Sequence, residues 1–311
     1  MRKQTLKVAA TAVVASAVSF AAVGNVQAAS NNMSKPGNGK TIKIGWTAWS
    51  DAKFVAHVVK TVIDNRTTDK VDLKMSAIGV QYKAVADGDL DGMIMSWLPD
   101  THRSYLKKVG NQLVDLGELY GGAKLGWVVP DYIPKSKLNS ISDLHKKMVQ
   151  NKLGGTIQGI DPGAGLMQLS KKTMKAYNLK SQYRLKAASG AAMTAALKRA
   201  ENNKSWIVVT GWTPHWMFGK WNLRFLKDPK GTLGSAQHID VQVRQGFKKD
   251  YPRIAQILSR MHFNLDNLQA AMYNARKTSE QKAVNKYIHN HQAHVNSWFY
   301  TNKKEAASSS S

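Results

Sequence analysis

The chain alternates short apolar strands with amphipathic helices, and this alternation limits its fold more than any other feature of the sequence. Strand patterns repeat every second residue and helical patterns about every 3.6 residues, so the two kinds of segment can be distinguished. Strand patterns lie at Thr41–Trp46, Val71–Ile78 and Gly92–Ser96, with helical patterns between them at Ala52–Asn65 and Tyr82–Asp87. This order predicts an α/β unit with a mainly parallel sheet.

A second unit of the same kind begins near residue 155. Its strand patterns lie at Gly155–Ile160, Tyr183–Ala187 and Trp206–Thr210, and its helical patterns lie at Leu166–Tyr177 and Ala191–Asn202. Two α/β units in succession predict two lobes, each with its own core.

The last part of the chain changes character after His238. A short strand pattern is followed there by helical patterns that continue as far as Phe299. A helical end of this kind can pack back on the first unit, so we predict that the chain crosses between the lobes twice. In this division lobe 1 comprises residues 41–125 and 240–302, and lobe 2 comprises residues 126–239.

The N-terminal segment has the three parts of a secretory signal peptide. A basic start is followed by an apolar stretch from Val8 to Val23 and by small residues up to Ala28. We expect residues 1–28 to be a signal peptide cleaved after Ala28, with an uncleaved anchor as the alternative, and the mature protein to be soluble and located at the cell envelope or outside it. Residues 29–40 are then a flexible leader, and residues 303–311 a disordered tail.

The 311-residue chain contains no cysteine, and its 45 Lys and Arg residues outnumber 20 Asp and Glu residues to give a formal net charge of +25. The absence of cysteine excludes a disulfide-stapled scaffold, a cysteine zinc site and a thiol nucleophile. It also removes the thiol that carries the lipid anchor of many exported proteins, so we do not expect a lipoprotein. Retention at a cell surface would then need electrostatic attraction or a partner.

Three of the nine tryptophans follow predicted strands. Trp49, Trp97 and Trp212 each stand just past the end of an apolar run and among turn-forming or polar residues. Because the carboxyl ends of strands in open α/β sheets face the ligand crevice, the three indoles can converge on one cleft. The alternative is that each fills a hydrophobic core. We assign four other tryptophans to the core: Trp46, Trp127, Trp206 and Trp298. The sequence does not decide between core and site for Trp216 and Trp221.

Aromatic faces attract a cation that cannot donate hydrogen bonds, and a trimethylammonium group is such a cation. Each desolvated contact contributes roughly 1 to 2 kcal/mol, so three rings with further help can support about micromolar binding. Further help is visible in the Gly-rich turn Gly159–Gly165, which leads into a predicted helix and can offer free N–H groups to an anion. His102 and His215 can each donate to a carboxylate, or can instead be capping or solvated side chains.

Five motifs together resemble the glycine betaine substrate-binding proteins of osmoprotectant ABC importers, over about Lys40 to Trp298. They are Gly45-Trp-Thr-Ala-Trp49, the run Ala86 to Gly92 with Ser96-Trp-Leu-Pro-Asp-Thr-His102, Gly159-Ile-Asp-Pro-Gly-Ala-Gly165, Ser189-Gly-Ala-Ala-Met193 and Val208-Val-Thr-Gly-Trp-Thr-Pro-His-Trp216. The resemblance implies a two-lobed, type II periplasmic-binding-protein-like α/β fold with a cleft between the lobes.

The same resemblance implies the site. Trp49, Trp97 and Trp212 would surround the quaternary ammonium, while the backbone N–H groups of Gly159 and Ile160 and the side chain of His102 would hold the carboxylate. It also implies delivery of the ligand to an ABC permease. Carnitine, proline betaine and choline share the quaternary group and stay open as ligands, although choline has no carboxylate for the anion site.

Two other classes of function were weighed. No nucleophile with a nearby base or cluster of metal ligands stands out, so we expect no enzyme, cofactor or metal; Asp87, Asp89 and Asp91 are interpreted as turn residues, with a metal site as the alternative. A secreted polyanion-binding protein is the second rival, because paired lysines such as Lys107-Lys108 attract anionic polymers. The pairs are scattered, so we expect a monomer without specific nucleic-acid binding and with electrostatic association to an anionic envelope.

Overall fold

The computed structural model describes residues 35–300, so the predicted signal peptide, the first part of the predicted leader and the predicted tail lie outside the described residues. The end of the leader is attached to the fold, because the backbone N–H groups of Asn38 and Lys40 donate to the Asp69 carboxylate at 3.0 and 2.9 Å. None of the helices in this part of the chain combines the length and the apolar character that crossing a bilayer requires.

The described residues form a nine-stranded sheet with the order β2-β1-β3-β9-β4-β7-β5-β6, and β8 pairs with β4 beside this path. The strands are β1 (Thr41–Trp46), β2 (Lys70–Met75), β3 (Gly92–Leu98), β4 (Leu113–Pro130), β5 (Thr156–Gln158), β6 (Arg184–Lys186), β7 (Val209–Thr213), β8 (Leu223–Phe225) and β9 (Gln237–Arg244).

The sheet as a whole is mixed, but the mainly parallel sheet predicted for the first α/β unit is confirmed in β1, β2 and β3. Strand β1 pairs in parallel with β2 and β3, and β5 pairs in parallel with β6 and β7. The pairs that involve β4 or β9 are antiparallel. These two strands run between the α/β units rather than inside them, so the helical crossovers that make neighbouring strands parallel do not govern them.

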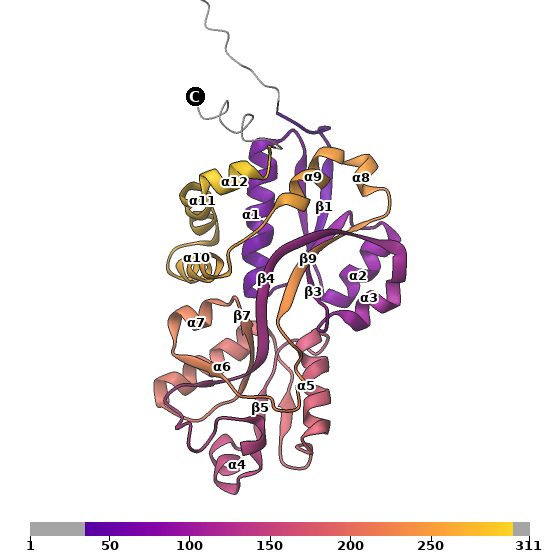
Figure 1. The fold of residues 1–311 in the computed structure, drawn as a ribbon. Coiled ribbons are helices and arrows are strands. Elements are labelled where there is room, and N and C mark those ends of the chain that lie inside the picture. Colours follow the sequence, from indigo (N-terminus) through magenta and orange to yellow (C-terminus); the bar gives the residue numbers. More distant parts are fainter. Residues whose placement is uncertain (1–34, 301–311) are drawn as a thin grey trace, which may run out of the picture. The chain divides into compact units, whose positions relative to one another are not determined.

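Strand β4 joins two halves of the sheet. Its first residues pair with β9 and its last residues pair with β7 and β8, and in Figure 1 it runs continuously from one half to the other. We call β2, β1, β3 and β9 the first half, and β7, β5, β6 and β8 the second half. The predicted lobe boundaries at residues 125/126 and 239/240 fall within β4 and β9 and stay a prediction.

Helices flank both halves. They are α1 (Ser50–Arg66), α2 (Ile78–Asp87), α3 (Arg103–Val109), α4 (Lys147–Leu153), α5 (Gly165–Ala176), α6 (Gly190–Asn203), α7 (Trp216–Lys220), α8 (Phe247–Asp250), α9 (Pro252–Arg260), α10 (Leu265–Lys277), α11 (Glu280–Asn290) and α12 (Gln292–Ser297). Helices α1, α10 and α11 pack together on one side of the first half, and α2 and α3 lie on its other side (Figure 1). Helix α10 also packs against α7, which links the C-terminal helices to the second half.

The local sequence explains why these elements form. Helix α1 buries Phe54, Val55, Val58, Val59 and Val62, which recur at helical spacing and face the first half of the sheet. Strand β3 is buried along its whole length and contains no charged residue, as expected for a strand that is covered on both faces. This packing makes the strands rigid, so the residues at the ends of β1, β3 and β7 have fixed positions.

Candidate ligand-binding site

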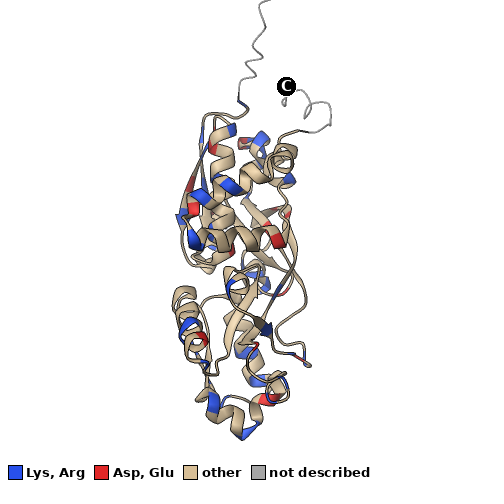
Figure 2. Cartoon of the chain, turned by 90° about the vertical axis from the view of Figure 1, so that its left-hand side faces the viewer, with Lys and Arg blue, Asp and Glu red and all other residues tan. Residues whose placement is uncertain are grey.

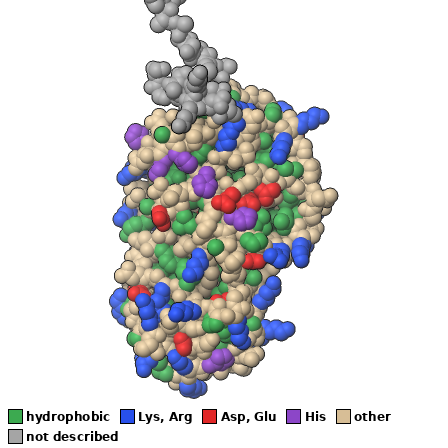
Figure 3. Space-filling view, viewed as in Figure 1, with side chains coloured by type: hydrophobic (Ala, Val, Ile, Leu, Met, Phe, Trp, Pro, Cys, Tyr) green, Lys and Arg blue, Asp and Glu red, His purple; other side chains and the backbone are tan. Residues whose placement is uncertain are grey.

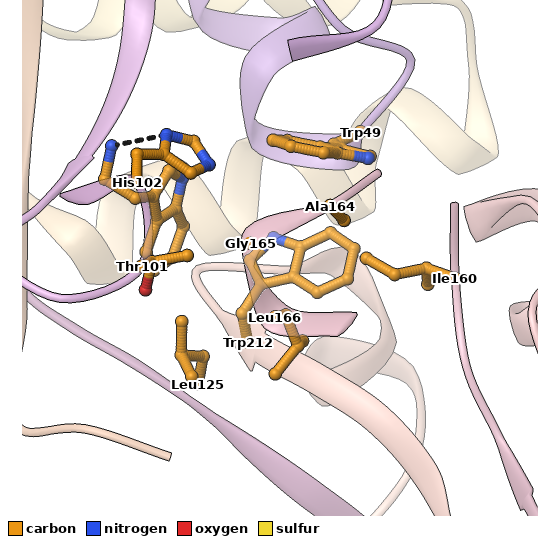
Figure 4. A pocket seen from close by; sticks show the side chains of 10 residues that line it. Trp49, Thr101, His102, Leu125, Ile160, Ala164, Gly165, Leu166 and Trp212 are labelled. Atoms are coloured by element: carbon orange, nitrogen blue, oxygen red, sulfur yellow. Dashed lines mark hydrogen bonds between the residues drawn. The ribbon is translucent and has the colours of Figure 1, made fainter. Parts of the chain in front are cut away.

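A small cavity lies where the ends of β1, β3 and β7 meet the start of α5. It encloses about 300 Å³ of empty space, its open mouth included. The lining residues are Trp49, Trp97, Thr101, His102, Leu125, Ile160, Ala164, Gly165, Leu166 and Trp212. Figure 4 shows the rings of Trp49 and Trp212 facing this cavity, with Ile160, Leu166 and Leu125 around them.

The structure brings the three predicted tryptophans to this one cavity. The rings of Trp49 and Trp212 have centroids 6.5 Å apart at an interplanar angle of 64°. The exposed fractions of Trp49, Trp97 and Trp212 are 6%, 3% and 4%, so the rings are largely shielded from water without being sealed in separate cores. A desolvated ring face is the form in which a cation–π contact is strongest.

Two of the three tryptophans lie on strands and not past their ends, which corrects the sequence prediction. Trp97 belongs to β3, and Trp212 belongs to β7, which begins at Val209 rather than at the predicted Trp206. Both strands end one residue later, before Pro99 and Pro214, because proline cannot donate to the strand ladder. Trp49 alone lies outside a strand, directly before the first residue of α1.

His102 is buried beside the tryptophans. Its Nδ1 accepts a hydrogen bond from the Trp97 backbone N–H at 3.1 Å, drawn as the dashed line in Figure 4. The ring proton of the neutral form therefore resides on Nε2. Burial lowers the pKa of His102 to about 3, although a hydrogen bond with the Met95 backbone raises it in part. The imidazole is thus neutral at neutral pH, and a ligand would have to compete with the Met95 carbonyl oxygen for its one N–H.

The start of α5 lies against the cavity. Ala164 precedes the helix without a side-chain cap, and Ala164, Gly165 and Leu166 line the cavity. The first N–H groups of a helix have no partner within it and carry the positive end of its dipole. This side of the cavity therefore suits an anionic group.

The two predicted backbone donors are placed differently. Ile160 lines the cavity, and its N–H makes no hydrogen bond with another residue in the described range 35–300. Gly159 does not line the cavity, and its N–H donates to the Lys186 carbonyl oxygen at 2.8 Å. A carboxylate bound by Gly159 would have to share or replace that bond, so the role of Gly159 stays a prediction.

Two carboxylates hold the indole N–H groups of the cavity. Trp49 Nε1 donates to Asp161 Oδ2 at 3.1 Å, and Trp212 Nε1 donates to Asp51 Oδ1 at 3.0 Å. Asp51 is fully buried and also accepts from the Tyr120 hydroxyl at 2.8 Å. Burial raises the pKa of Asp51, and the hydrogen bonds from Tyr120 and Trp212 oppose that rise. Because both indole N–H groups already donate to carboxylates, Trp49 and Trp212 can contact a ligand only through the faces and the other edges of their rings.

The second candidate histidine has a different position. His215 Nδ1 accepts from the Met217 backbone N–H at 3.1 Å and so caps α7, and its ring packs edge-on against Trp212 at 4.7 Å. Trp216 and Trp221, which the sequence left open, pack against each other at 5.6 Å beside a neighbouring surface hollow. Among the tryptophans assigned to the core, Trp127 and Trp298 are fully buried, whereas Trp46 and Trp206 are half-buried against it.

Several site residues were missed by sequence reasoning. Thr101, Leu125, Ala164, Gly165 and Leu166 line the cavity beside the predicted set. Gly165 and Ala164 belong to the Gly-rich turn that had been singled out as an anion receptor, so a signal for them was present. Leu125 lies inside an apolar run of β4, and nothing in that run distinguishes it from a core residue.

The alternating aspartates make structural pairs. Asp91 accepts from the Lys43 backbone N–H at 2.8 Å and pairs with Arg244 at 2.9 Å, while Asp87 pairs with Lys83 at 2.6 Å. Across residues 35–300 no group of three or more acidic or histidine side chains is arranged to hold a metal ion.

A mixed α/β fold with two sheet halves and a small aromatic cavity between their strand ends defines a solute-binding protein of the periplasmic-binding-protein class. Two solved structures support this class. The structure matches lactococcal OpuAC, crystallised in a closed form with glycine betaine, with a TM-score of 0.78 and 34% identity over 84% of this chain and 100% of that one. It matches a glycine betaine and L-proline ABC transporter binding protein (ProX) from Borrelia burgdorferi with a TM-score of 0.78 and 27% identity over 86% of this chain and 98% of that one.

The family follows from the sequence match. The family described as the substrate binding domain of ABC-type glycine betaine transport systems matches residues 40–290, and the chain belongs to this family. The glycine betaine/carnitine transport binding protein GbuC of Listeria monocytogenes is 39% identical over 155 residues, which are 49% of this chain and 52% of that protein. The chain thus spans about half the length of this curated relative. The family and fold-class predictions are confirmed, and the family is one of extracellular or periplasmic transport proteins rather than enzymes.

Proposed function

We propose that the protein captures glycine betaine or a related quaternary ammonium zwitterion and delivers it to the permease of an ABC importer. The observation that carries this proposal is the convergence of Trp49, Trp97 and Trp212 on one shielded cavity. The similarity to lactococcal OpuAC, which was crystallised with glycine betaine, and to GbuC supports the same class of ligand.

The cation is held by ring faces. A trimethylammonium group has no N–H to donate, so aromatic faces alone can hold it, whereas a primary ammonium needs hydrogen-bond acceptors for its N–H groups. Each desolvated ring contact contributes about 1 to 2 kcal/mol. Because Trp49 and Trp212 use their N–H groups on Asp161 and Asp51, their faces stay available and their orientation is fixed.

The carboxylate is held at the start of α5. Ile160, whose N–H has no partner within residues 35–300, lines the same cavity as the indoles, together with the first residues of α5 and His102. Their distribution around the cavity matches a zwitterion whose two charges are separated by one or a few carbons. Choline lacks the carboxylate and would leave these donors unpaired, which costs binding free energy. Carnitine and proline betaine keep both groups and remain candidates beside glycine betaine.

Capture couples to closure of the two halves. Trp49, Trp97 and His102 come from elements of the first half, whereas Ile160 and Trp212 come from the second half. A ligand that contacts both sides favours the closed arrangement, which a permease can then recognise. We retain residues 41–125 with 240–302, and residues 126–239, as the two moving lobes.

The test is calorimetry on a Trp97→Ala variant. We expect glycine betaine binding to weaken at least tenfold, about 1.4 kcal/mol, because one face of the cage is lost. Trp46→Ala is the matched control, because Trp46 ends β1 and packs against His57 at 5.8 Å beside a different surface hollow. An unchanged dissociation constant for Trp97→Ala, with the fold verified by circular dichroism, removes Trp97 from the cage. A thermal-shift panel of glycine betaine, carnitine, proline betaine and choline at fixed salt then ranks the ligands.

A further inference from the structure

The indole–carboxylate hydrogen bonds of the cavity cross from one half of the sheet to the other. Trp49 precedes α1 in the first half, and its acceptor Asp161 follows β5 in the second half. Trp212 belongs to β7 in the second half, and its acceptor Asp51 lies in the first turn of α1. The two bonds therefore run in opposite directions, since each half supplies one indole and one carboxylate.

Residues of high sequence separation make these bonds. Trp49 and Asp161 are 112 positions apart, and Trp212 and Asp51 are 161 positions apart. Trp212 and Asp51 are both buried, so the bond between them is shielded from water and is stronger than its surface equivalent, whereas the Trp49–Asp161 bond is part-buried because Asp161 is half-buried. Separation of the halves breaks both bonds together and leaves Asp51 with the Tyr120 hydroxyl as its remaining side-chain donor.

We propose that Asp161 and Asp51 are positioning residues that form a cross-cleft latch, which fixes the cage indoles when the halves close and slows ligand release. This inference rests on the proposed function. The latch makes assembly of the cage and closure of the cleft one event, because each indole is oriented by the opposite half. Donation to a carboxylate also shifts electron density into the indole ring, which favours a cation at its face.

Other bonds cross between the halves without holding an indole. The Ser104 hydroxyl donates to Gln168 Oε1 at 2.8 Å, and the Tyr105 hydroxyl donates to the Gly163 carbonyl oxygen. Ser104 and Gln168 line an adjoining surface hollow and not the cage. Ser104→Ala thus provides a matched control that removes one cross-half bond and leaves the indoles oriented.

The test is a double-mutant cycle on Trp49 and Asp161, read by stopped-flow release of glycine betaine. Trp49→Phe keeps an aromatic ring and removes the N–H, and Asp161→Ala removes the acceptor. Asp161 is half-buried and makes no recorded side-chain bond within residues 35–300 besides that to Trp49, so the fold should tolerate the change. We expect Asp161→Ala to raise the dissociation rate constant about tenfold in the otherwise unchanged protein. In the Trp49→Phe variant, the same substitution should raise it less than twofold further, because the indole N–H is already absent.

The control variant gives a second comparison. Ser104→Ala should change the dissociation rate constant less than threefold, and in the double variant with Trp49→Phe the fold-changes of the two single variants should multiply. Two outcomes overturn the latch. In the first, Asp161→Ala has the same dissociation rate constant as the unchanged protein. In the second, the fold-changes of Asp161→Ala and Trp49→Phe multiply in the double variant.

An arm read at the indole separates this inference from the proposed function. Hydrogen exchange of the Trp49 indole N–H, followed by NMR at saturating glycine betaine so that the halves are closed, should accelerate in Asp161→Ala and stay unchanged in Ser104→Ala. Loss of glycine betaine binding by the unchanged protein would end the proposed function, whereas an unaltered indole exchange rate would end the latch.

Discussion

At the scale of single residues, His102 decides how binding depends on pH. Burial holds its pKa at about 3, far below the ordinary histidine value, so the ring stays neutral from pH 5 to pH 9. We therefore expect the dissociation constant for glycine betaine to change less than twofold over that range, as measured by calorimetry in buffers of matched ionic strength. A tenfold change between pH 7 and pH 5 would show that the histidine binds a carboxylate as a cation.

The three tryptophans of the site were predictable because the local sequence places them near strand ends, whereas the Gly-rich turn and the family resemblance pointed to Ile160. Trp49, Trp97, Trp212, His102 and Ile160 all line the cavity, and Gly159 does not. Their carboxylate partners were not identified, because nothing local distinguishes an aspartate that accepts from an indole 112 or 161 positions away. Such contacts depend on which strands the topology brings side by side.

At the scale of elements, the approach of α5 to the first half of the sheet depends on Gly165. A Cβ at this position would collide with the Thr101 carbonyl oxygen and lie 2.9 Å from His102 Cδ2. We expect Gly165→Ala to weaken glycine betaine binding at least tenfold, because α5 must move away from the cavity wall, and calorimetry measures this loss.

The control for that change is two residues away. At Gly163 an added Cβ meets only the Tyr105 hydroxyl oxygen at 3.7 Å, an ordinary contact distance. Gly163→Ala should therefore bind glycine betaine within threefold of the unchanged protein. Equal losses in both variants would mean that flexibility of the turn, and not the close approach at Gly165, governs binding.

The elements themselves were mostly predictable, and β4 shows where the prediction stopped. The apolar run at Lys124–Pro130 indicates only the last part of this strand, which begins at Leu113. Its earlier part carries Gly117 and Gly122 at positive φ and shifts register against β9, so the alternation of apolar and polar residues is lost. That part is a strand because β9 supplies its hydrogen bonds, which no local pattern records.

At the scale of the whole molecule, buried histidines make stability depend on acidity. Burial, with a smaller contribution from the Arg276 charge, lowers the pKa of His215 to about 3. Between that value and the ordinary pKa of about 6.5, the unfolded chain binds a proton that the folded chain does not bind. Lowering the pH from 7 to 5 therefore reduces the free energy of unfolding by about 2 kcal/mol for each such histidine.

A variant isolates this effect from other titrating groups. Asn at position 215 keeps a side-chain acceptor for capping α7 and does not titrate. We expect the free energy of unfolding of His215→Asn, measured by urea denaturation at pH 7 and pH 5, to fall about 2 kcal/mol less than that of the unchanged protein. Identical decreases in the two proteins would show that His215 is already accessible to protons in the folded state.

The distribution of charge over the molecule separates surface attraction from ligand capture. Residues 126–239 contain eighteen Lys and Arg residues against five Asp and Glu residues. Figure 2 shows Lys and Arg positions spread along the fold, and on the face seen in Figure 3 basic side chains are distributed and not gathered at one site. Attraction between exposed charges weakens as salt shortens the screening length from about 10 Å at 0.1 M to about 3 Å at 1 M. The proposed cage is shielded from water, and glycine betaine carries no net charge, so salt should affect its binding little.

We therefore expect sedimentation with vesicles of phosphatidylglycerol and phosphatidylcholine at about 0.05 M salt and its loss at about 1 M, while the dissociation constant for glycine betaine changes less than threefold. Replacement of the exposed Lys171 and Lys172 of α5 by glutamate should weaken sedimentation and leave ligand binding intact. If ligand affinity instead fell in parallel with vesicle binding as salt rose, the ligand would be held by exposed charges, and the aromatic cavity would not be its site.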